Sequence, residues 1–585
     1  MTRHRKTRAE PGSRSRRDRG DDVHRDDTTY RYRTIDGAHD EEPTGSAAVP
    51  TNRDAAGGVA LMGIGSTIDS LFKGPDDLDL TEGGIGWPLF YLSLPIVVMN
   101  LFQTAYNLAD TFWLGQFDTT ALAAISFAFP MVFLLISLAL GLSVAGSVLV
   151  AQHVGAGRTD RAEYAASQTM SYAVIASVML GAVGVLFVDE FLVLLGASDA
   201  IAPLVESYMR VFSAGLVFVF GFAVFVALMR GYGDTVTPMY VMAGSVVLNV
   251  LLDPILIFGF TGNPLFEALG AEGIQAWLFA ATGYAGSGIE GAAIATVFSR
   301  ALALVVGLVI MFGGTRGVRI RLGQMAPDRA FARKVFDIGV PASVEGTARS
   351  LSINLLLFVI AAFPETVVAA YGIGTRIFSV VFLPALAVSQ GIETMTGQNI
   401  GAGKPDRAAA TNHFGARAMF YVLTGVGAIT LVAARPIAAV FTTDPAVIAE
   451  SATFLRYSAV TFGFIGVMRA YTGGFRGAGK TLIAAVVSVI TLGAIRLPVA
   501  WIGAAAIGSV GLWVSFAVSN VAGGIIAYLW FGRGTWRDGA ITDRGVTDDV
   551  GSASDTGSAA DTSSATDTSP ATDIDSATDV EPTTD

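Results

Sequence analysis

The chain has 585 residues, of which 52% are hydrophobic and 15% charged, and its net charge is −11. Its apolar segments reach the roughly 20 residues that a helix needs to cross a bilayer, which excludes a soluble globular protein and indicates a multi-pass membrane protein. There is no cysteine, so disulfides, thiolate metal sites and a cysteine nucleophile are excluded.

The two ends of the chain differ from this apolar core. Residues 1–60 mix arginine-rich and acidic runs, and residues 540–585 repeat Thr, Ser, Ala and Asp. Such segments bury too little apolar surface to offset their ordering entropy, so we expect both tails to be disordered. Most of the negative charge lies in the C-terminal tail and therefore says little about a substrate.

Twelve apolar segments predict twelve transmembrane helices. The first six lie near residues 87–114, 121–151, 162–187, 200–229, 238–260 and 288–312. The second six lie near residues 331–361, 366–397, 408–432, 446–470, 482–501 and 510–531. We predict an all-α polytopic membrane protein with two six-helix lobes. The predicted divisions are an N-terminal tail and pre-helix at 1–80, an N lobe at 81–315, a C lobe at 316–535 and an acidic tail at 536–585.

The second group of six spans repeats the first. Gln152–Ala162 has the sequence QHVGAGRTDRA and Gln398–Ala408 has QNIGAGKPDRA, a shift of 246 residues that also carries Pro95 onto Pro341. Because each half has an even number of spans, both halves enter the membrane from the same side, as parallel repeats do. A duplicated helical bundle is typical of secondary transporters, which bind substrate between the halves.

Basic residues gather in the connections on one side of the membrane. They include Arg158, Arg230, the segment 316–334, Lys404 and Arg476, whereas the opposite connections carry only Arg435. By the positive-inside rule we expect the basic side and both termini to face the cytoplasm. On the other side, the loop at 261–287 is longer than its counterpart and is expected to be a surface insertion.

Polar residues inside the first six spans form the candidate coupling site. A carboxylate near the bilayer centre costs about 2.5–3.5 kcal/mol on insertion scales, so each one needs an explanation. Asp110 lies in the first span and Asp253 in the fifth, one turn after Asn249, while Thr296 and Asn107 offer further oxygens. Such a cluster can bind Na⁺ as a hard cation or share a proton between its carboxyl groups. The alternative is that the two acids lie near helix ends in headgroup water.

The second half lacks this cluster. Leu356, Ile495 and Val499 occupy the positions equivalent to Asp110, Asn249 and Asp253. Shared packing would have preserved residue types in both copies, so the acids indicate a task that one half performs alone.

Other positions suggest substrate contacts or movement. Gln103 and Tyr106 precede Asp110 and are candidate substrate-binding residues, although packing explains Tyr106 equally well. Glu345 is the second-half candidate, and its spacing predicts an ion pair with Arg349. Pro95 is a candidate hinge or an ordinary transmembrane kink.

One motif matches a nucleotide-binding pattern by chance. Gly474–Thr481 satisfies the phosphate-loop pattern GxxxxGK[ST], but it joins two membrane spans instead of a strand and a helix. We therefore predict no nucleotide binding. We also expect no nucleic-acid partner and no enzymatic activity, since no set of nucleophile, base and orienting residue is present.

Several motifs together resemble a known family. They are LTEG at Leu80–Gly83, NLADTFWLG at Asn107–Gly115, the paired GAG loops, Asn249-x₃-Asp253-Pro-Ile-Leu and GAAIAT at Gly291–Thr296. This combination resembles the multidrug and toxic compound extrusion (MATE) family, and within it the DinF-like, archaeal-type branch. The resemblance covers residues 80–531 and includes neither the tails nor the long outer loop.

The resemblance implies a twelve-helix transporter with two lobes around a central cavity. Such a protein would act in the cell membrane as an antiporter, exporting organic cations or other amphipathic compounds against a Na⁺ or H⁺ gradient. The implied coupling-ion site consists of Asp110, Asn249, Asp253 and Thr296. We expect no cofactor other than the coupling ion. The expected partners are a small-molecule substrate and the lipid bilayer, and the protein is expected to be a monomer.

Two other classes of function compete with this prediction. A flippase for lipid-linked sugars or related lipids would use cationic side chains to bind pyrophosphate, and Arg349, Arg376, Arg469 and Arg496 are candidates. A membrane receptor or scaffold would bind partners through its tails, but it would not need acids in one half only.

Overall fold

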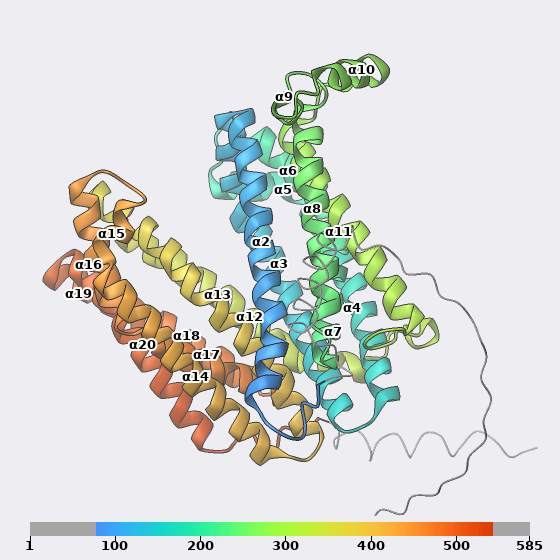
Figure 1. Ribbon diagram of the computed structural model, residues 1–585, viewed down its shortest axis with the longest axis vertical. Coiled ribbons are helices and arrows are strands. Elements are labelled where there is room, and N and C mark those ends of the chain that lie inside the picture. The colour runs from blue at the N-terminus through green and yellow to red at the C-terminus, as the bar shows by residue number, and fades with distance from the viewer. Residues whose placement is uncertain (1–77, 542–585) are drawn as a thin grey trace, which may run out of the picture. The chain divides into compact units, whose positions relative to one another are not determined.

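The computed structural model describes residues 78–541, in which every regular element is a helix (Figure 1). The predicted tails at 1–77 and 542–585 lie outside the described residues. Ten helical segments among the described residues are long and apolar enough to cross a membrane, one of them the continuous run of α18, η3 and α19 at Thr481–Ile507, and there are eleven if the bent pair α6 and α7 is one span. The predicted all-α membrane fold is confirmed.

The helices fall into two consecutive groups. The first group is α2 (Gly86–Phe117), α3 (Thr119–Gly155), α4 (Thr159–Leu186), α5 (Val188–Leu195), α6 (Ala202–Ala214), α7 (Leu216–Tyr232), α8 (Val236–Phe258), α9 (Pro264–Ala268), α10 (Glu272–Thr282) and α11 (Gly288–Gly313). A short 3₁₀ turn, η2 (Leu322–Gln324), lies in the linker. The second group is α12 (Arg329–Ile360), α13 (Glu365–Gly401), α14 (Pro405–Val432), α15 (Ala434–Ala439), α16 (Pro445–Ala459), α17 (Phe462–Gly477), α18 (Thr481–Val489), the π-helix η3 (Ile490–Arg496), α19 (Leu497–Ile507) and α20 (Ser509–Gly532).

Two predicted spans are each built from two helices. The span near 200–229 consists of α6 and α7, which are bent by 53° at Gly215. A Cβ at Gly215 would overlap the side chain of Val297, so glycine allows the chain to turn close to α11. The span near 446–470 consists of α16 and α17, with 15 and 16 residues. Counting this pair as one span also gives the predicted total of twelve.

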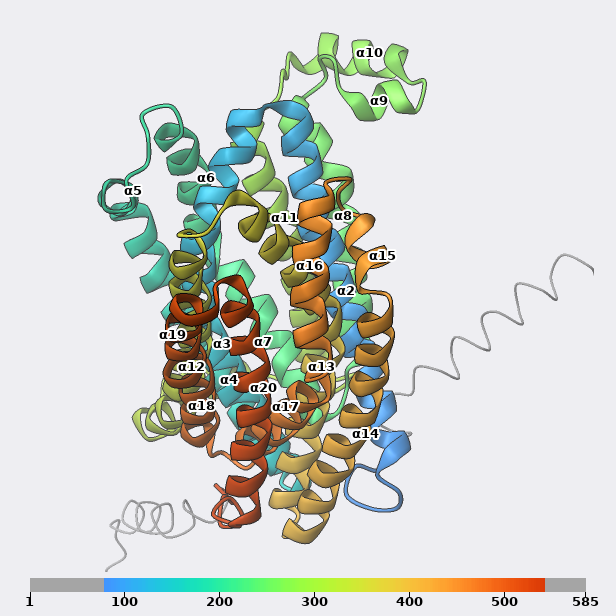
Figure 2. The same ribbon diagram turned by 90° about the vertical axis from the view of Figure 1, so that its left-hand side faces the viewer.

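The two groups of helices contact each other through α3 and α2. Helix α3 packs on α12 and α13, and α2 packs on α13. In Figure 1 the groups lie against each other at the lower end, and α14, α16 and α20 diverge from α2 and α8 toward the upper end. Figure 2 shows the molecule from the side of the second group. The small residues Gly141 and Gly339 allow α3 and α12 to approach closely, as is common where transmembrane helices pack.

A reciprocal pair of glutamines joins the two groups at the lower end. Gln152 of α3 donates through Nε2 to the carbonyl oxygen of Gly477 at 3.1 Å. Gln398 of α13 donates in the same way to the carbonyl oxygen of Gly231 at 3.2 Å. Both glutamines are buried, and they occupy equivalent positions in the sequence repeat. We call this arrangement the clasp.

The glycines of the same repeat make the clasp possible. A Cβ at Gly155 would overlap the backbone carbonyl of Gln398, and a Cβ at Gly401 would overlap that of Gln152. Each loop thus lies directly on the backbone of the other half. The sequence QxxG is therefore a contact between the halves, in addition to being a turn.

The linker between the halves is fixed to α4. The side chain of Gln168 donates to the carbonyl oxygens of Gln324 and Ala326 and accepts from the backbone N–H of Asp328. Asp328 caps α12 and accepts a hydrogen bond from the Tyr164 hydroxyl at 2.6 Å, which lowers the pKa of its carboxyl group.

The inserted loop at 261–287 contains two short helices, α9 and α10, that bury no residue. Its base is tied to α8, because Asn263 donates to the carbonyl oxygens of Pro254 and Gly259, both at 2.8 Å. The insertion therefore lies at the end of a helix that carries candidate site residues.

The close backbone contact of the clasp predicts that a methyl group added at Gly155 will change the distance between the halves. Gly155→Ala should separate the lower ends of the halves, because ordinary carbon–oxygen contacts lie at about 3.3–3.6 Å. The chain has no native cysteine, so spin labels at Asp160→Cys and Asp406→Cys report this distance by pulsed electron resonance. We expect the mean distance to grow by about 2 Å or more.

The matched control is Gly244→Ala, since a Cβ at Gly244 meets nothing within 4 Å. An unchanged distance in Gly155→Ala, or equal changes in both variants, would contradict the role of the clasp.

Candidate functional site

Three helices bring the predicted coupling residues together. Helix α8 packs against both α2 and α11, which places Asn249 and Asp253 beside Asp110 of α2, while Thr296 of α11 lies beside Tyr106 of α2. Asn249 and Asp253 are completely buried, while Asp110 and Thr296 are 8% and 7% exposed. Asn249 donates through Nδ2 to Asp253 Oδ1 at 2.9 Å, as their i, i+4 spacing allows.

The carboxyl groups of Asp110 and Asp253 lie close enough for the charge of one to act on the other. Two ionised carboxylates are both acceptors, so a hydrogen bond between them requires a proton. At this separation a proton or a bound cation removes the repulsion between the two acids.

Each of these four residues has an oxygen available for a further ligand. Asp110 Oδ1, Asn249 Oδ1, Asp253 Oδ2 and Thr296 Oγ1 are buried and accept no hydrogen bond from the described residues. Leaving such an atom unpaired costs about 1–3 kcal/mol. Oxygen donors of this kind, from carboxylate, amide and hydroxyl groups, suit a hard cation such as Na⁺.

A buried arginine that we did not single out in the sequence completes the site. Arg300 lies on α11, one turn after Thr296, and is 6% exposed. Its guanidinium lies 4.7 Å from the centre of the Tyr106 ring, and its charge acts on Asp110. The signal for it was present, because Arg300 is a charged residue inside the predicted sixth span.

The remaining first-half candidates surround Arg300 and not the acids. Gln103 Oε1 accepts a hydrogen bond from Arg300 at 2.7 Å, and Gln103 Nε2 donates to Asn107 Oδ1 at 3.0 Å. Asn107 is exposed on α2, and its side-chain oxygen binds Gln103, although it was predicted to join Asp110. Tyr106 is buried beneath Arg300.

Pro95 lies inside α2, which continues as one α-helix from Gly86 to Phe117. On one side of Pro95, Leu89 and Ser93 contact Gly391 of α13. On the other side, α2 carries Asp110. Pro95 therefore lies between the part of α2 that is packed on the second half and the part that carries the acid.

In the second half, Glu345 belongs to an ion-pair network. The predicted pair with Arg349 is confirmed at 3.3 Å, and Arg476 and Ser488 also donate to Glu345, at 3.3 and 3.1 Å. Arg476 continues to Glu393 at 2.9 Å. These buried groups thus join four helices, which are α12, α13, α17 and, through Ser488, α18.

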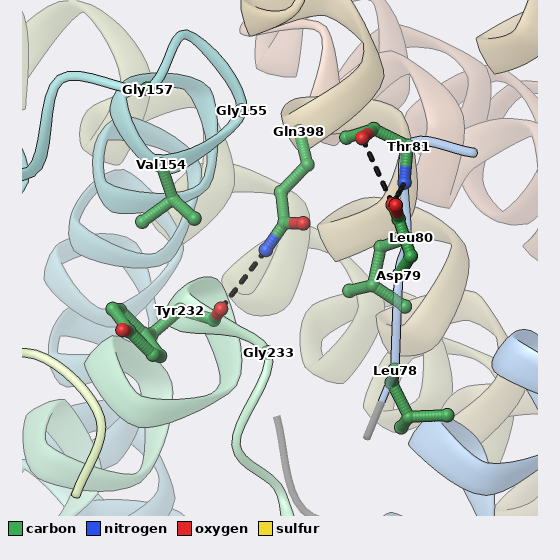
Figure 3. A pocket seen from close by; sticks show the side chains of 10 residues that line it. All are labelled: Leu78, Asp79, Leu80, Thr81, Val154, Gly155, Gly157, Tyr232, Gly233 and Gln398. Atoms are coloured by element: carbon green, nitrogen blue, oxygen red, sulfur yellow. Dashed lines mark hydrogen bonds between the residues drawn. The ribbon is translucent and has the colours of Figure 1, made fainter. Parts of the chain in front are cut away.

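A recess in the surface lies beside the clasp (Figure 3). Gln398 stands between its two walls and donates to the carbonyl oxygen of Tyr232 at 3.0 Å. Asp79, on the opposite wall, accepts from the backbone N–H and hydroxyl of Thr81 at 2.8 and 3.0 Å. The backbone N–H of Thr81 lowers the pKa of Asp79. The groups of this recess are engaged in holding the lower end together, so we do not assign it to substrate.

The fold and the buried polar groups define a multi-pass membrane transporter. The sequence profile of the MatE family matches residues 95–255 and 341–502, which are the two repeats. The chain therefore belongs to the MatE family, the MATE transporters that its motifs resemble, and is a transporter and not an enzyme. The branch within the family stays a prediction.

Among relatives, the FAD transporter of Shewanella oneidensis is 28% identical, covering 77% of this chain and 95% of its own. The probable multidrug resistance protein YpnP of Bacillus subtilis is 27% identical, covering 78% and 97%. The solved structure of the Vibrio cholerae MATE transporter VcmN in the bent form has a TM-score of 0.69 at 23% identity, covering 78% of this chain and 98% of that one. The structural likeness shows the shared fold.

The site predicts the effect of removing Arg300. Arg300→Gln takes one positive charge away from Asp110 and Asp253, so the cluster should bind its cation more tightly, by about tenfold or more. The cation concentration for half-maximal dye efflux from everted vesicles should fall accordingly.

The control is Arg210→Gln, because Arg210 is an exposed arginine paired with Asp189 and Glu206. Weaker cation dependence in Arg300→Gln, with normal expression, would show that Arg300 does not oppose the cation.

Proposed function

We propose that this protein is a secondary active antiporter that exports small organic amphipathic compounds, driven by a Na⁺ or H⁺ gradient. The observation that carries the proposal is the set of buried residues Asp110, Asn249, Asp253 and Thr296, each with an oxygen that has no partner among residues 78–541. The equivalent positions of the second half carry Leu356, Ile495 and Val499, so the acids are specific to one half.

The charges of the site support one monovalent cation per cycle. With both carboxylates ionised, Asp110 and Asp253 contribute −2 and Arg300 contributes +1, which leaves −1. One proton or one Na⁺ brings this buried group to neutrality. A buried net charge is costly in a low-dielectric region, so the site favours the occupied state until the gradient removes the cation.

Helix α2 links the cation to the contact between the halves. It carries Asp110 at one end and packs on α13 through Leu89 and Ser93 at the other, with Pro95 between them. A proline in a helix removes one backbone hydrogen bond and permits bending. Cation binding at Asp110 can therefore alter the packing of the halves.

In this proposal the clasp closes the transporter on the cytoplasmic side. It lies beside the connections that carry Arg158 and Lys404, which the positive-inside rule assigns to the cytoplasm. Arg230 and Arg476, predicted in such connections, lie instead within α7 and α17 and are buried. Opening of the clasp would then expose the substrate site to the cytoplasm. Both termini would be cytoplasmic in a protein of the cell membrane, acting as a monomer with no cofactor beyond the coupling ion.

The names of the relatives support export of organic molecules. One is called an FAD transporter and another a probable multidrug resistance protein. Both names refer to molecules with extended organic bodies, which agrees with an amphipathic substrate class.

The test is dye efflux from everted vesicles under a Na⁺ gradient and, separately, under a proton gradient. We expect Asp253→Asn to reduce gradient-driven efflux by tenfold or more, on the order of one lost charge-assisted interaction. Asp189→Asn, at an exposed acid of the same half, should transport as wild type does.

Efflux that is equal in Asp253→Asn and wild type would refute the coupling site. Absence of wild-type efflux under either gradient would instead favour the lipid flippase.

A further inference from the structure

The second half buries more positive than negative charge. Its network contains four arginines and two glutamates: Arg230 reaching across from α7, Arg349, Arg469, Arg476, Glu345 and Glu393. The arginines Arg230, Arg469 and Arg476 are 7%, 3% and 6% exposed, and the two glutamates 4% and 2%. Buried charges are normally paired, so two positive charges of this network have no carboxylate of their own within the part of the chain that the structure describes.

Arg469 is the least satisfied member of the network. Its closest carboxylate oxygen is Glu345 Oε1, 3.9 Å from Nη1, which is beyond hydrogen-bond distance. Its Nε is buried without a partner among the described residues. Glu345 is already engaged by Arg349, Arg476 and Ser488. A guanidinium has five N–H donors, so Arg469 retains the capacity to bind an anion.

Arg349 and Arg469 share one aromatic ring. Their guanidinium carbons lie 5.5 and 4.4 Å from the centre of the Phe382 ring. The Arg349 side chain is 24% exposed, so this group of three residues reaches an accessible surface, while Arg469 is buried behind it. Arg349 Nε also lacks a partner among residues 78–541.

We propose that Arg349, Arg469 and Phe382 bind the anionic group and adjoining apolar body of the transported molecule. Planar guanidinium groups match carboxylate and phosphate oxygens, and the ring accepts an apolar or aromatic surface. This inference rests on the proposed transport function and narrows its substrate class from cationic or amphipathic compounds to amphipathic organic anions.

The two halves then have complementary tasks. The first-half site holds two acids and one arginine and takes a cation, and the second-half network, which includes Arg230 from α7, holds two more arginines than glutamates and takes an anion. The arrangement explains why the acids and the additional arginines occur in different copies of the repeat.

The test is equilibrium binding to the full chain in phosphatidylcholine nanodiscs, followed by fluorescence anisotropy. The probes are carboxyfluorescein, an amphipathic anion, and ethidium, an aromatic cation. Arg349→Gln should weaken carboxyfluorescein by about tenfold or more, since it removes charge-assisted hydrogen bonds, without weakening ethidium. Arg456→Gln is the matched control, because Arg456 is an exposed arginine on α16 of the same half.

A second variant distinguishes loss of anion binding from loss of folding. Arg469→Lys keeps the buried charge but loses the planar fork, so it should also weaken carboxyfluorescein while melting as wild type does. Unchanged carboxyfluorescein affinity in both variants, or equal loss of both probes, overturns the proposal. Competition by phosphatidylglycerol in the nanodiscs would support the site and assign its anion to a lipid headgroup.

The outcome is separable from that of the proposed function. Carboxyfluorescein binding with no gradient-driven efflux would leave the anion site standing and reject the antiporter. Gradient-driven ethidium efflux without carboxyfluorescein binding would reject the anion site and leave the antiporter standing.

Discussion

The structure depends on backbone contact between two copies of one loop. At Gly155 and Gly401 each half lies directly on the backbone carbonyl of a glutamine in the other, and those glutamines cross to the opposite half. Neutral amide hydrogen bonds and small residues make this contact. Beside it, the buried ion pair between Arg230 of α7 and Glu393 of α13, at 3.5 Å, also joins the two halves. Opening the interface therefore breaks the amide hydrogen bonds and separates this ion pair.

The duplication makes the helical scaffold of the two halves symmetric, but the two halves bury different charged residues. The clasp uses equivalent residues in both halves, because both must approach each other equally. Asp110 and Asp253 have acidic side chains only in the first half, and Arg349 and Arg469 have no arginine at the equivalent first-half positions. A symmetric frame with unlike buried charges gives two separate binding sites that share one movement. Helix α2 connects them, since it carries Asp110 and packs on α13.

The sequence predicted those features that depend on apolar length, repetition and local spacing. It predicted the spans, the first-half acids and the pair of Glu345 with Arg349. It did not predict the break between α16 and α17, because mean hydropathy continues across it. It also did not predict the clasp, since a GAG loop has the same composition whether it forms a turn or contacts the other half. Arg300 was overlooked because its partners, Gln103 and Tyr106, come from a distant part of the chain.

The most direct test of cation coupling is the reverse reaction in proteoliposomes. A gradient of transported dye is imposed while Na⁺ and H⁺ are equal on both sides, and the movement of each cation is followed with an indicator. The account predicts that the dye gradient drives one of these cations in the opposite direction, and that Asp253→Asn abolishes this movement. Dye transport with no movement of either cation would contradict the account.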